Sequence, residues 1–309
     1  MSLTYAIIGC GGIGGYYGGS LAKAGHNVHF LLHSDYEFVK KNGLQIDSVK
    51  GDFHLTNVNA YNDSTQMPKC DVVFVCLKTI YNHNLPKLLS PILHKDSVVV
   101  LIQNGLGIEQ TLHEELPNVK IVGATAFICT FKVGKGHIRH AEYGTLTMAP
   151  FSDDCDSIMT QIVEDFASAN VEVRLDKDLN SIRWKKLVWN IPYNGLTVVM
   201  NASTDVLTMN PHSRQLVVDL MNEVVDAGRA CGAVISNSFV DKMIEMTEKM
   251  VPYSPSMRLD YEAHRPMEIQ TMYTNPILVA RKKGFEMKKT QMLEQQLRFI
   301  SENQLTEKE

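Results

Sequence analysis

Short, almost continuously apolar runs alternate with helical patterns along the first part of the chain. The expected strands are residues 6–8, 27–32, 72–77, 97–102 and 120–126. Strands that are apolar on both sides, and that are separated by helices, are typical of a parallel sheet covered on both faces. The pattern therefore predicts that the chain begins with an α/β domain.

The pattern changes twice further along. Residues 130–149 contain glycine-marked hairpins, which predict antiparallel strands, and a helix at 157–169 with a strand at 171–175 closes the domain. Beyond about Asp178 no strand pattern remains, and helical patterns cover residues 181–200, 211–231, 237–250, 268–283 and 289–301. We therefore expect an α/β domain over residues 1–177 and an all-α domain over residues 178–309.

A glycine-rich segment, Gly9-Cys10-Gly11-Gly12-Ile13-Gly14, follows the first strand and opens a helix. Gly9 allows the tight turn, Gly11 leaves room for a pyrophosphate, and Gly14 lets the helix pack close to the strand. The positive N-terminal end of the helix favours phosphate at the same place. An ordinary glycine turn is the alternative, but the order strand, glycine loop, helix and second strand predicts a Rossmann-type dinucleotide-binding domain.

Polar residues follow two of the expected strands. Lys78 comes directly after the run 72–77, and Asn104 follows the run 97–102. Each alone is more often a capping or surface residue. Ligands of open parallel sheets bind beyond the carboxyl ends of the strands, so the two residues together favour a binding site at that edge.

Lys186, Asn190 and Asn194 recur every four residues inside an apolar helical pattern. On a helix this spacing places one ammonium and two amides on a single face. Asparagine is a poor helix former, so two inside a helix need a reason, although a solvated face is the simpler alternative. Pro192 removes one backbone hydrogen bond of this helix and can kink it.

A second polar cluster contains Ser256 and Glu268, and both lie near prolines. From the residues alone, capping of helix ends is the favoured explanation for them.

The composition narrows the choice of partners. The 309 residues carry a net charge of −4, so neither nucleic acid nor an anionic membrane is an expected partner, and no apolar run is long enough to cross a bilayer. The six cysteines and eleven histidines show no metal-ligand spacing, so no metal site is expected. His137 and His140 are both expected at the surface. A strand is expected within a few residues of Met1, so no signal peptide is expected. The cysteines favour a reducing, cytoplasmic compartment.

These motifs together resemble the ketopantoate reductase (2-dehydropantoate 2-reductase) family over essentially the whole chain. The segments that carry the resemblance are Gly9–Gly14, Leu77–Thr79, Gln103–Gly105, the Lys186, Asn190 and Asn194 stripe, and Ser256 with Glu268. The resemblance implies that the N-terminal domain binds NADPH. It also implies reduction of a small-molecule 2-oxo acid, 2-dehydropantoate, to pantoate in the route to pantothenate and coenzyme A. Apolar helices with Met and Trp could supply the surface of a homodimer.

The resemblance implies a chemical role for three residues of the helical domain. Lys186 matches the general acid that protonates the developing alkoxide, and Glu268 matches the acidic group beside it. Ser256 matches the serine that binds the substrate carboxylate. These roles agree with the physical chemistry, because an ammonium close to an alkoxide both stabilises it and can give it a proton.

Four further residues match binding positions of the family. Asn190 and Asn194 match the amides that hold the substrate hydroxyl, and Asn104 matches a residue that bridges cofactor and substrate. Lys78 matches a residue near the nicotinamide end of the cofactor.

The chain departs from the family pattern in two places. His33 and Ser34 stand where many members have an arginine for the 2′-phosphate of NADP. Asp35 could instead accept the ribose hydroxyls of NAD, although Lys40 and Lys41 could compensate. The segment that follows Glu268 also differs, because Gln270-Thr271-Met272-Tyr273 replaces the common pattern. Alternatives are therefore NAD as cofactor, another branched 2-oxo acid or an opine-type imine as substrate, and a non-catalytic dinucleotide sensor.

Overall fold

The computed structural model describes residues 2–306, which form two compact units. The first unit contains the residues up to 103 and residues 108–179, and the second contains residues 104–107 and the chain from 180 onward. The boundary expected near residue 177 had left Asn104 in the first domain. The structure groups Asn104 with the helices instead, because hydrogen bonds join residues 104–107 to the helical unit.

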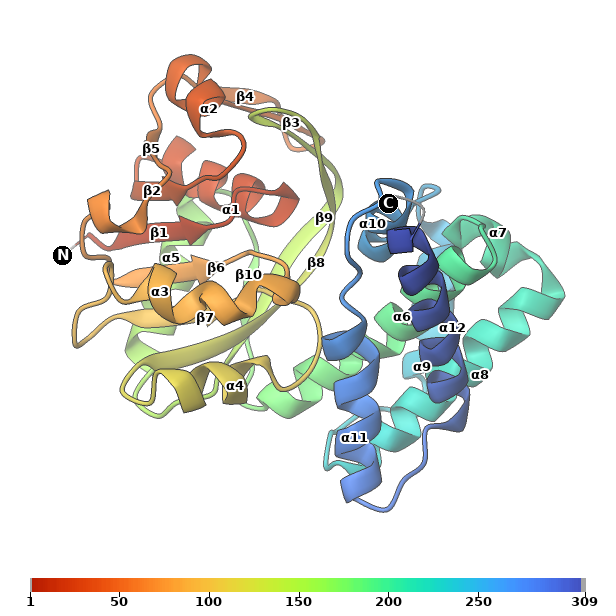
Figure 1. Ribbon diagram of the computed structural model, residues 1–309. Coiled ribbons are helices and arrows are strands. Elements are labelled where there is room, and N and C mark those ends of the chain that lie inside the picture. The colour runs from red at the N-terminus through yellow and green to blue at the C-terminus, as the bar shows by residue number, and fades with distance from the viewer. Residues whose placement is uncertain (1, 307–309) are drawn as a thin grey trace. The chain divides into compact units, whose positions relative to one another are not determined.

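The first unit is built on one sheet (Figure 1). Its strands are β1 (Thr4–Ile8), β2 (Asn27–Leu31), β3 (Leu44–Ser48), β4 (Phe53–Leu55), β5 (Asn59–Tyr61), β6 (Val72–Val75), β7 (Val98–Leu101), β8 (Lys120–Gly134), β9 (His137–Pro150) and β10 (Val173–Leu175). Their order is β4-β3-β9-β8-β7-β6-β1-β2-β5, and β10 lies beside β9. Every pair from β5 through β2, β1, β6 and β7 to β8 is parallel, as the apolar runs predicted.

Helices bury both faces of this sheet, which is why its central strands β6 and β7 are apolar and buried at every position. The α-helices are α1 (Gly12–Lys23), α2 (Tyr36–Asn42), α3 (Leu85–Leu89), α4 (Ile108–Glu115) and α5 (Asp156–Ser168), and 3₁₀ turns cover Ser64–Gln66 and Thr79–Asn84. Alternate residues of β1 point to opposite faces: Tyr5 and Ile7 join a core with α1 and α5, whereas Ala6 and Ile8 join a core with α3 and α4. The Rossmann-type α/β prediction for this part of the chain is confirmed.

One long hairpin replaces the shorter strands and hairpins expected over residues 120–149. The first residues of β8 pair in parallel with β7, and the strand then continues as the antiparallel partner of β9. Register shifts between Phe127 and Ile128 and between Cys129 and Thr130 mark irregularities along it. Such bulges bend a strand, so a single strand can belong to both the parallel and the antiparallel parts of the sheet.

The expectation that His140 lies at the surface was wrong. Its side chain is 1% exposed. Its Nδ1 lies 2.8 Å from the Ser48 hydroxyl, its Nε2 lies 3.1 Å from the Tyr143 carbonyl oxygen, and its ring packs on Tyr16. Burial lowers the pKa of this imidazole. The pairing of β9 with β3 covers the histidine, and that pairing joins segments too far apart to be read from local spacing.

The second unit is helical, as expected, and is centred on α6 (Leu179–Val199), which is buried along most of its length. Its other elements are α7 (Thr204–Met209), α8 (Pro211–Ala230), α9 (Phe239–Lys249), α10 (Ser256–Glu262), a π-helical turn (Gln270–Thr274), α11 (Asn275–Lys282) and α12 (Lys288–Thr306). Helix α6 runs through Pro192 without a break. Among the described residues, no helix combines the length and apolar character needed to span a bilayer.

The π-helical turn explains why residues 104–107 belong to the second unit. In a π-helix the carbonyl of Thr271 would accept a hydrogen bond from residue 276, but Pro276 has no N–H. The Leu106 N–H donates to the Thr271 carbonyl instead, at 3.0 Å, and the Asn275 side-chain amide donates to the Leu106 carbonyl at 2.7 Å. These bonds attach the segment that carries Asn104 to the helical unit.

Candidate active site

The glycine loop has the geometry that a dinucleotide requires. A Cβ placed on Gly14 would lie 2.1 Å from the carbonyl oxygen of Gly9, so only glycine lets α1 approach β1 this closely. A Cβ on Gly11 would have no atom within 4 Å, so the space beside this glycine is open. Open space at the second glycine, next to the N-terminus of α1, is what a pyrophosphate needs.

The other residues of the loop serve mainly to support it. Cys10 and Ile13 pack against the core that α1 shares with the sheet, and α1 begins at Gly12. Burial raises the pKa of the Cys10 thiol to about 12, with a smaller contribution from Asp35 in the same direction. Cys10 is therefore a neutral packing residue of the glycine loop rather than a reactive thiolate.

Three consecutive polar residues follow β2, and they differ in their exposure to solvent. His33 and Ser34 are exposed, whereas Asp35 is buried. The Lys132 ammonium lies 2.6 Å from Asp35 Oδ1, the Gly136 N–H donates to Oδ2 at 3.0 Å, and the Ser34 hydroxyl lies 3.3 Å from Oδ1. Burial alone would raise the pKa of Asp35, but the Gly136 hydrogen bond and Lys132 outweigh it and lower the pKa. Both carboxylate oxygens of Asp35 thus have partners within the protein.

Lys78 lies at the end of β6, immediately before the 3₁₀ turn that begins at Thr79. The turn is held by Gln103, whose side-chain amide donates to the Leu77 carbonyl at 2.8 Å and to Asn82 Oδ1 at 2.6 Å. Gln103 is visible in the sequence only as part of a motif, so this positioning role was missed. Its signal was available, because a glutamine at the end of a buried strand needs a polar partner.

In the helical unit, α6 brings the expected amides together with residues far away in sequence. Asn190 and Asn194 are each 2% exposed, which excludes the solvated face considered above. Asn190 donates from Nδ2 to Asn104 Oδ1 at 3.2 Å. Asn194 accepts at Oδ1 from the Met257 N–H at 3.0 Å, and the Ser256 hydroxyl lies 3.5 Å from the same oxygen. A line of amides therefore links Asn104 to the start of α10.

The two ionisable residues of the expected site belong to the same unit. Lys186 lies one turn before Asn190 on α6, with its ammonium 6.0 Å from the centre of the Trp189 ring. Glu268 is buried just before the π-helical turn, and its carbonyl accepts from the Met272 N–H at 3.3 Å. Met272 Sδ in turn lies 3.9 Å from Asn190 Nδ2. Glu268 and the amide line thus share Met272 as a neighbour.

Capping does not explain Ser256. The residue before α10 is Pro255, and Ser256 is the first residue of the helix, with its hydroxyl directed to the Asn194 side chain. Its position therefore leaves the serine available for a role other than capping.

Family models match both parts of the chain. Residues 5–153 match the model described as "Ketopantoate reductase PanE/ApbA", and residues 178–301 match the model of its C-terminal part. The chain belongs to this ketopantoate reductase family. A 2-dehydropantoate 2-reductase from Nostoc sp. is 48% identical over 301 residues, which cover 96% of this chain and 94% of that protein.

Solved structures of ketopantoate reductases share the fold. A 2-dehydropantoate 2-reductase from Geobacter metallireducens is 35% identical and matches with a TM-score of 0.92, covering 96% of this chain and 99% of that one. A ketopantoate reductase from Staphylococcus aureus, named as dimeric, matches with a TM-score of 0.82 at 20% identity, over 98% of this chain and 100% of that one. The resemblance inferred from the motifs is confirmed.

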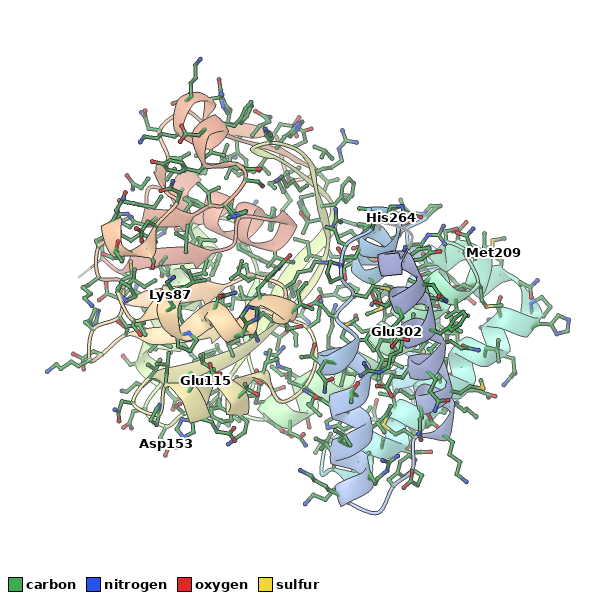
Figure 2. All side chains as sticks on the ribbon, in the orientation of Figure 1. Lys87, Glu115, Asp153, Met209, His264 and Glu302 are labelled. Carbon is green, nitrogen blue, oxygen red and sulfur yellow. The ribbon has the colours of Figure 1, made fainter. Side chains whose placement is uncertain are left out.

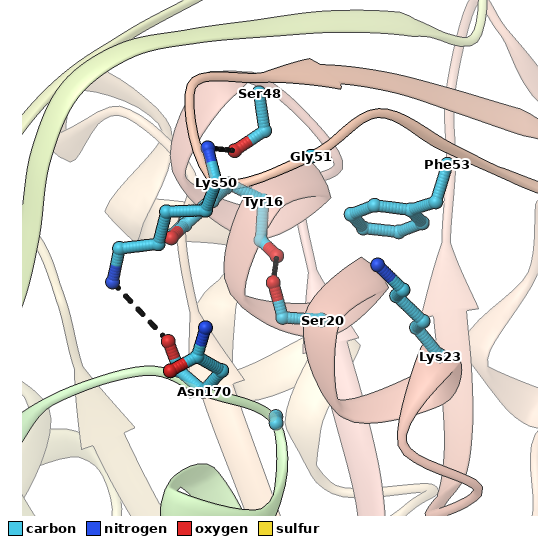
Figure 3. A pocket seen from close by; sticks show the side chains of 9 residues that line it. Tyr16, Ser20, Lys23, Ser48, Lys50, Gly51, Phe53 and Asn170 are labelled. Atoms are coloured by element: carbon cyan, nitrogen blue, oxygen red, sulfur yellow. Dashed lines mark hydrogen bonds between the residues drawn. The ribbon is translucent and has the colours of Figure 1, made fainter.

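A pocket of about 50 Å³ in the first unit is lined by none of the residues expected of a ketopantoate reductase site (Figure 3). It is lined by Tyr16, Ser20, Lys23, Ser48, Lys50, Gly51, Phe53, Ala169 and Asn170. Its two ammonium groups are engaged separately, since Lys50 donates to the Asn170 carbonyl at 3.2 Å and Lys23 lies 4.5 Å above the Phe53 ring. The cations do not converge, so this pocket lacks the arrangement that would bind an anion.

Proposed function

We propose that this chain reduces 2-dehydropantoate to pantoate with NADPH, in the biosynthesis of pantothenate and coenzyme A. The observation that carries the proposal is the buried line of amides from Asn104 through Asn190 to Asn194, with Lys186 one turn away on the same helix. Neutral amides inside an apolar helix are suited to hold a substrate hydroxyl without adding charge. The 48% identity to a protein named 2-dehydropantoate 2-reductase supports the choice of substrate.

The residues of the helical unit supply binding and a proton. The loop Gly9–Gly14 would hold NADPH, which when bound would supply the hydride for the carbonyl carbon of the 2-oxo acid. Lys186 gives a proton from its ammonium to the carbonyl oxygen, so that the alkoxide becomes a hydroxyl as it forms. Glu268 stabilises the charged form of Lys186, because a nearby carboxylate opposes the loss of the ammonium proton.

The remaining residues orient the substrate and the cofactor. Ser256 binds the substrate carboxylate, Asn190 and Asn194 bind its hydroxyl, and Asn104 contacts both cofactor and substrate. In the first unit, the loop Gly9–Gly14 holds the pyrophosphate. Lys78 lies near the nicotinamide end, and His33 with Ser34 meets the 2′-phosphate.

A substrate panel tests the proposal. The purified full-length chain is mixed with NADPH and 2-dehydropantoate, the loss of absorbance of the reduced nicotinamide is followed, and the product is identified as pantoate by mass spectrometry. The departure at Gln270–Tyr273 favours a second candidate, another branched 2-oxo acid or an opine-type imine, so these compounds belong in the same panel. Binding of NADPH without turnover of any of them would instead support a dinucleotide sensor.

A homodimer and a cytoplasmic location complete the proposal. Val206 and Met209 lie one turn apart on α7 and are exposed, as is Leu216 on α8, and Figure 2 labels Met209. These apolar side chains, together with the dimeric relative, support a homodimer. Sedimentation of the wild type and of Met209→Glu tests it, since a charge in the interface would favour the monomer.

The six free cysteines suit a reducing cytoplasm, which fractionation of the source cells tests.

A further inference from the structure

The tip of β2 and the β8–β9 hairpin are joined by an ion pair that is buried on one side only. The Asp35 side chain is 6% exposed, whereas the Lys132 side chain that contacts it is 36% exposed. The carboxylate therefore lies underneath and the lysine lies toward solvent. The two residues immediately before Asp35, His33 and Ser34, are exposed at the same tip.

This placement matters because the end of the second strand decides cofactor choice in Rossmann-type domains. An acidic residue there accepts the ribose 2′-hydroxyl of NAD, and a cationic residue accommodates the 2′-phosphate of NADP. Here the acid is present in the sequence, but Lys132 and the Gly136 N–H engage its two oxygens. A lysine has three N–H donors, and the bond to Asp35 accounts for one of them.

One other cation close to the tip, Lys40, is directed elsewhere. Lys40 on α2 donates to the Tyr36 hydroxyl at 2.8 Å, and its ammonium lies 5.1 Å from the centre of the Tyr36 ring. Lys132, in contrast, is in direct contact with the residue that follows the exposed tip.

We infer that Lys132 determines cofactor specificity, by presenting a cation to the 2′-phosphate of NADPH while it covers the Asp35 carboxylate. The inference rests on the proposed NADPH-dependent function and adds a residue to its binding site. Lys132 acts in two ways. It attracts the phosphate, and it keeps the carboxylate from repelling the phosphate or from accepting the ribose hydroxyls of NADH.

The two actions predict opposite effects on the two cofactors. Lys132→Ala removes the cation and uncovers Asp35, so NADPH binding weakens and NADH binding tightens. We expect the preference for NADPH over NADH to fall by ~10- to 100-fold, the range of a hydrogen bond to a charged group. Lys132→Arg keeps the cation and is expected to keep the preference. Asp35→Asn with Lys132→Met removes both charges, so NADPH weakens and NADH does not tighten.

The test measures binding rather than turnover. Dissociation constants for NADPH, NADH, 2′,5′-ADP and 5′-AMP are determined by calorimetry on the full-length chain, for the wild type and for each variant. The adenosine pair isolates the 2′-phosphate from the nicotinamide. Lys120→Ala is the matched control, because Lys120 lies at the start of the same strand and its ammonium also donates a hydrogen bond, to the backbone carbonyl of Asp154. The control is expected to bind all four ligands as the wild type does.

The outcomes distinguish a failure of the role inferred for Lys132 from a failure of the proposed NADPH-dependent function. Equal binding of 2′,5′-ADP and 5′-AMP by the wild type would overturn the proposed 2′-phosphate site itself. A wild-type preference that survives in Lys132→Ala would overturn the role of Lys132 alone. If uncovering Asp35 prevents that variant from folding, the double variant decides: an unchanged preference for 2′,5′-ADP overturns the inference, and a lost one supports it.

Discussion

The side chain of Asn190 donates a hydrogen bond to Asn104 across 86 positions of sequence, at 3.2 Å. Asn190 lies in the middle of α6, and Asn104 lies on the short segment that the π-helical turn attaches to the helical unit. The bond uses one donor of Asn190 and one acceptor of Asn104, which fixes the orientation of both amides. The amide that we expect to meet both cofactor and substrate is therefore oriented by the substrate-binding helix.

Asn190→Asp tests this relationship. The variant keeps the shape of the side chain but replaces the donor with a carboxylate, which faces the Asn104 oxygen without a hydrogen between them. We expect KM for the 2-oxo acid to rise and the free energy of unfolding to fall by about 1–3 kcal/mol, the cost of a buried group that loses its partner. Steady-state kinetics and urea unfolding measure the two effects. Wild-type KM in a folded Asn190→Asp protein would contradict the proposed role.

Lys186→Ala tests the proton donor. A positioned general acid contributes typically ~10²- to 10⁴-fold, so kcat is expected to fall by that amount while the protein remains folded. Lys185→Ala is the matched control, because Lys185 is next to Lys186 in sequence and points to a different side of the same helix. Single-turnover measurements with saturating NADPH separate the chemical step from release of product. If both variants turned over equally fast, Lys186 would have no place in the mechanism.

Ser256 and Glu268 are expected to affect different kinetic constants. Ser256→Ala removes a contact to the carboxylate that is present before and during reaction, so it raises KM and leaves kcat largely unchanged. Glu268→Gln removes the charge that we propose keeps Lys186 protonated, so it is expected to lower kcat as well. Steady-state kinetics of both variants provide the comparison. A purely structural role for Ser256 would show as a lower melting temperature with unaltered KM.

Two alanine substitutions in the glycine loop are expected to separate folding from cofactor binding. Gly14→Ala places a Cβ 2.1 Å from the Gly9 carbonyl oxygen, so it is expected to destabilise the fold by ~3 kcal/mol or more. Gly11→Ala meets no protein atom within 4 Å, so it is expected to fold normally and to bind NADPH weakly. Thermal unfolding and calorimetric titration check the pair. Normal NADPH affinity in Gly11→Ala would exclude the space beside that glycine as the pyrophosphate site.

Asp35 is expected to make stability depend on pH in the acid range. Its pKa is lowered in the folded protein from the ordinary value near 3.8, so its contribution is fully present above about pH 3.8 and is lost as the pH falls through the lower folded value. Asp35→Asn has no carboxylate at this position, so it is expected to lose less stability than the wild type on acidification. Urea unfolding midpoints at pH 3 and pH 7 for the wild type, Asp35→Asn and the exposed control Asp153→Asn measure it. Equal loss of stability in all three proteins on acidification would contradict the expectation.

The sequence by itself determined those features that depend on neighbouring positions. Continuous apolar runs indicated a sheet buried on both faces, and glycines at positions 9, 11 and 14 indicated a dinucleotide loop, because the strand, turn and helix lie within one short segment. The four-residue spacing of Lys186, Asn190 and Asn194 indicated one helix face for the same reason.

Only the tertiary structure decided which partners these residues have. Asp35 appeared able to read a ribose, but Lys132, 97 positions away, holds it because β8 extends into a hairpin that reaches the tip of β2. Asn104 follows a strand of the sheet in sequence, but Pro276, just after the π-helical turn, leaves the Thr271 carbonyl to accept a hydrogen bond from Leu106. Contacts of this kind join groups that are distant in sequence. Burial requires each polar group to find a partner, and only the folded chain determines which partner is within reach.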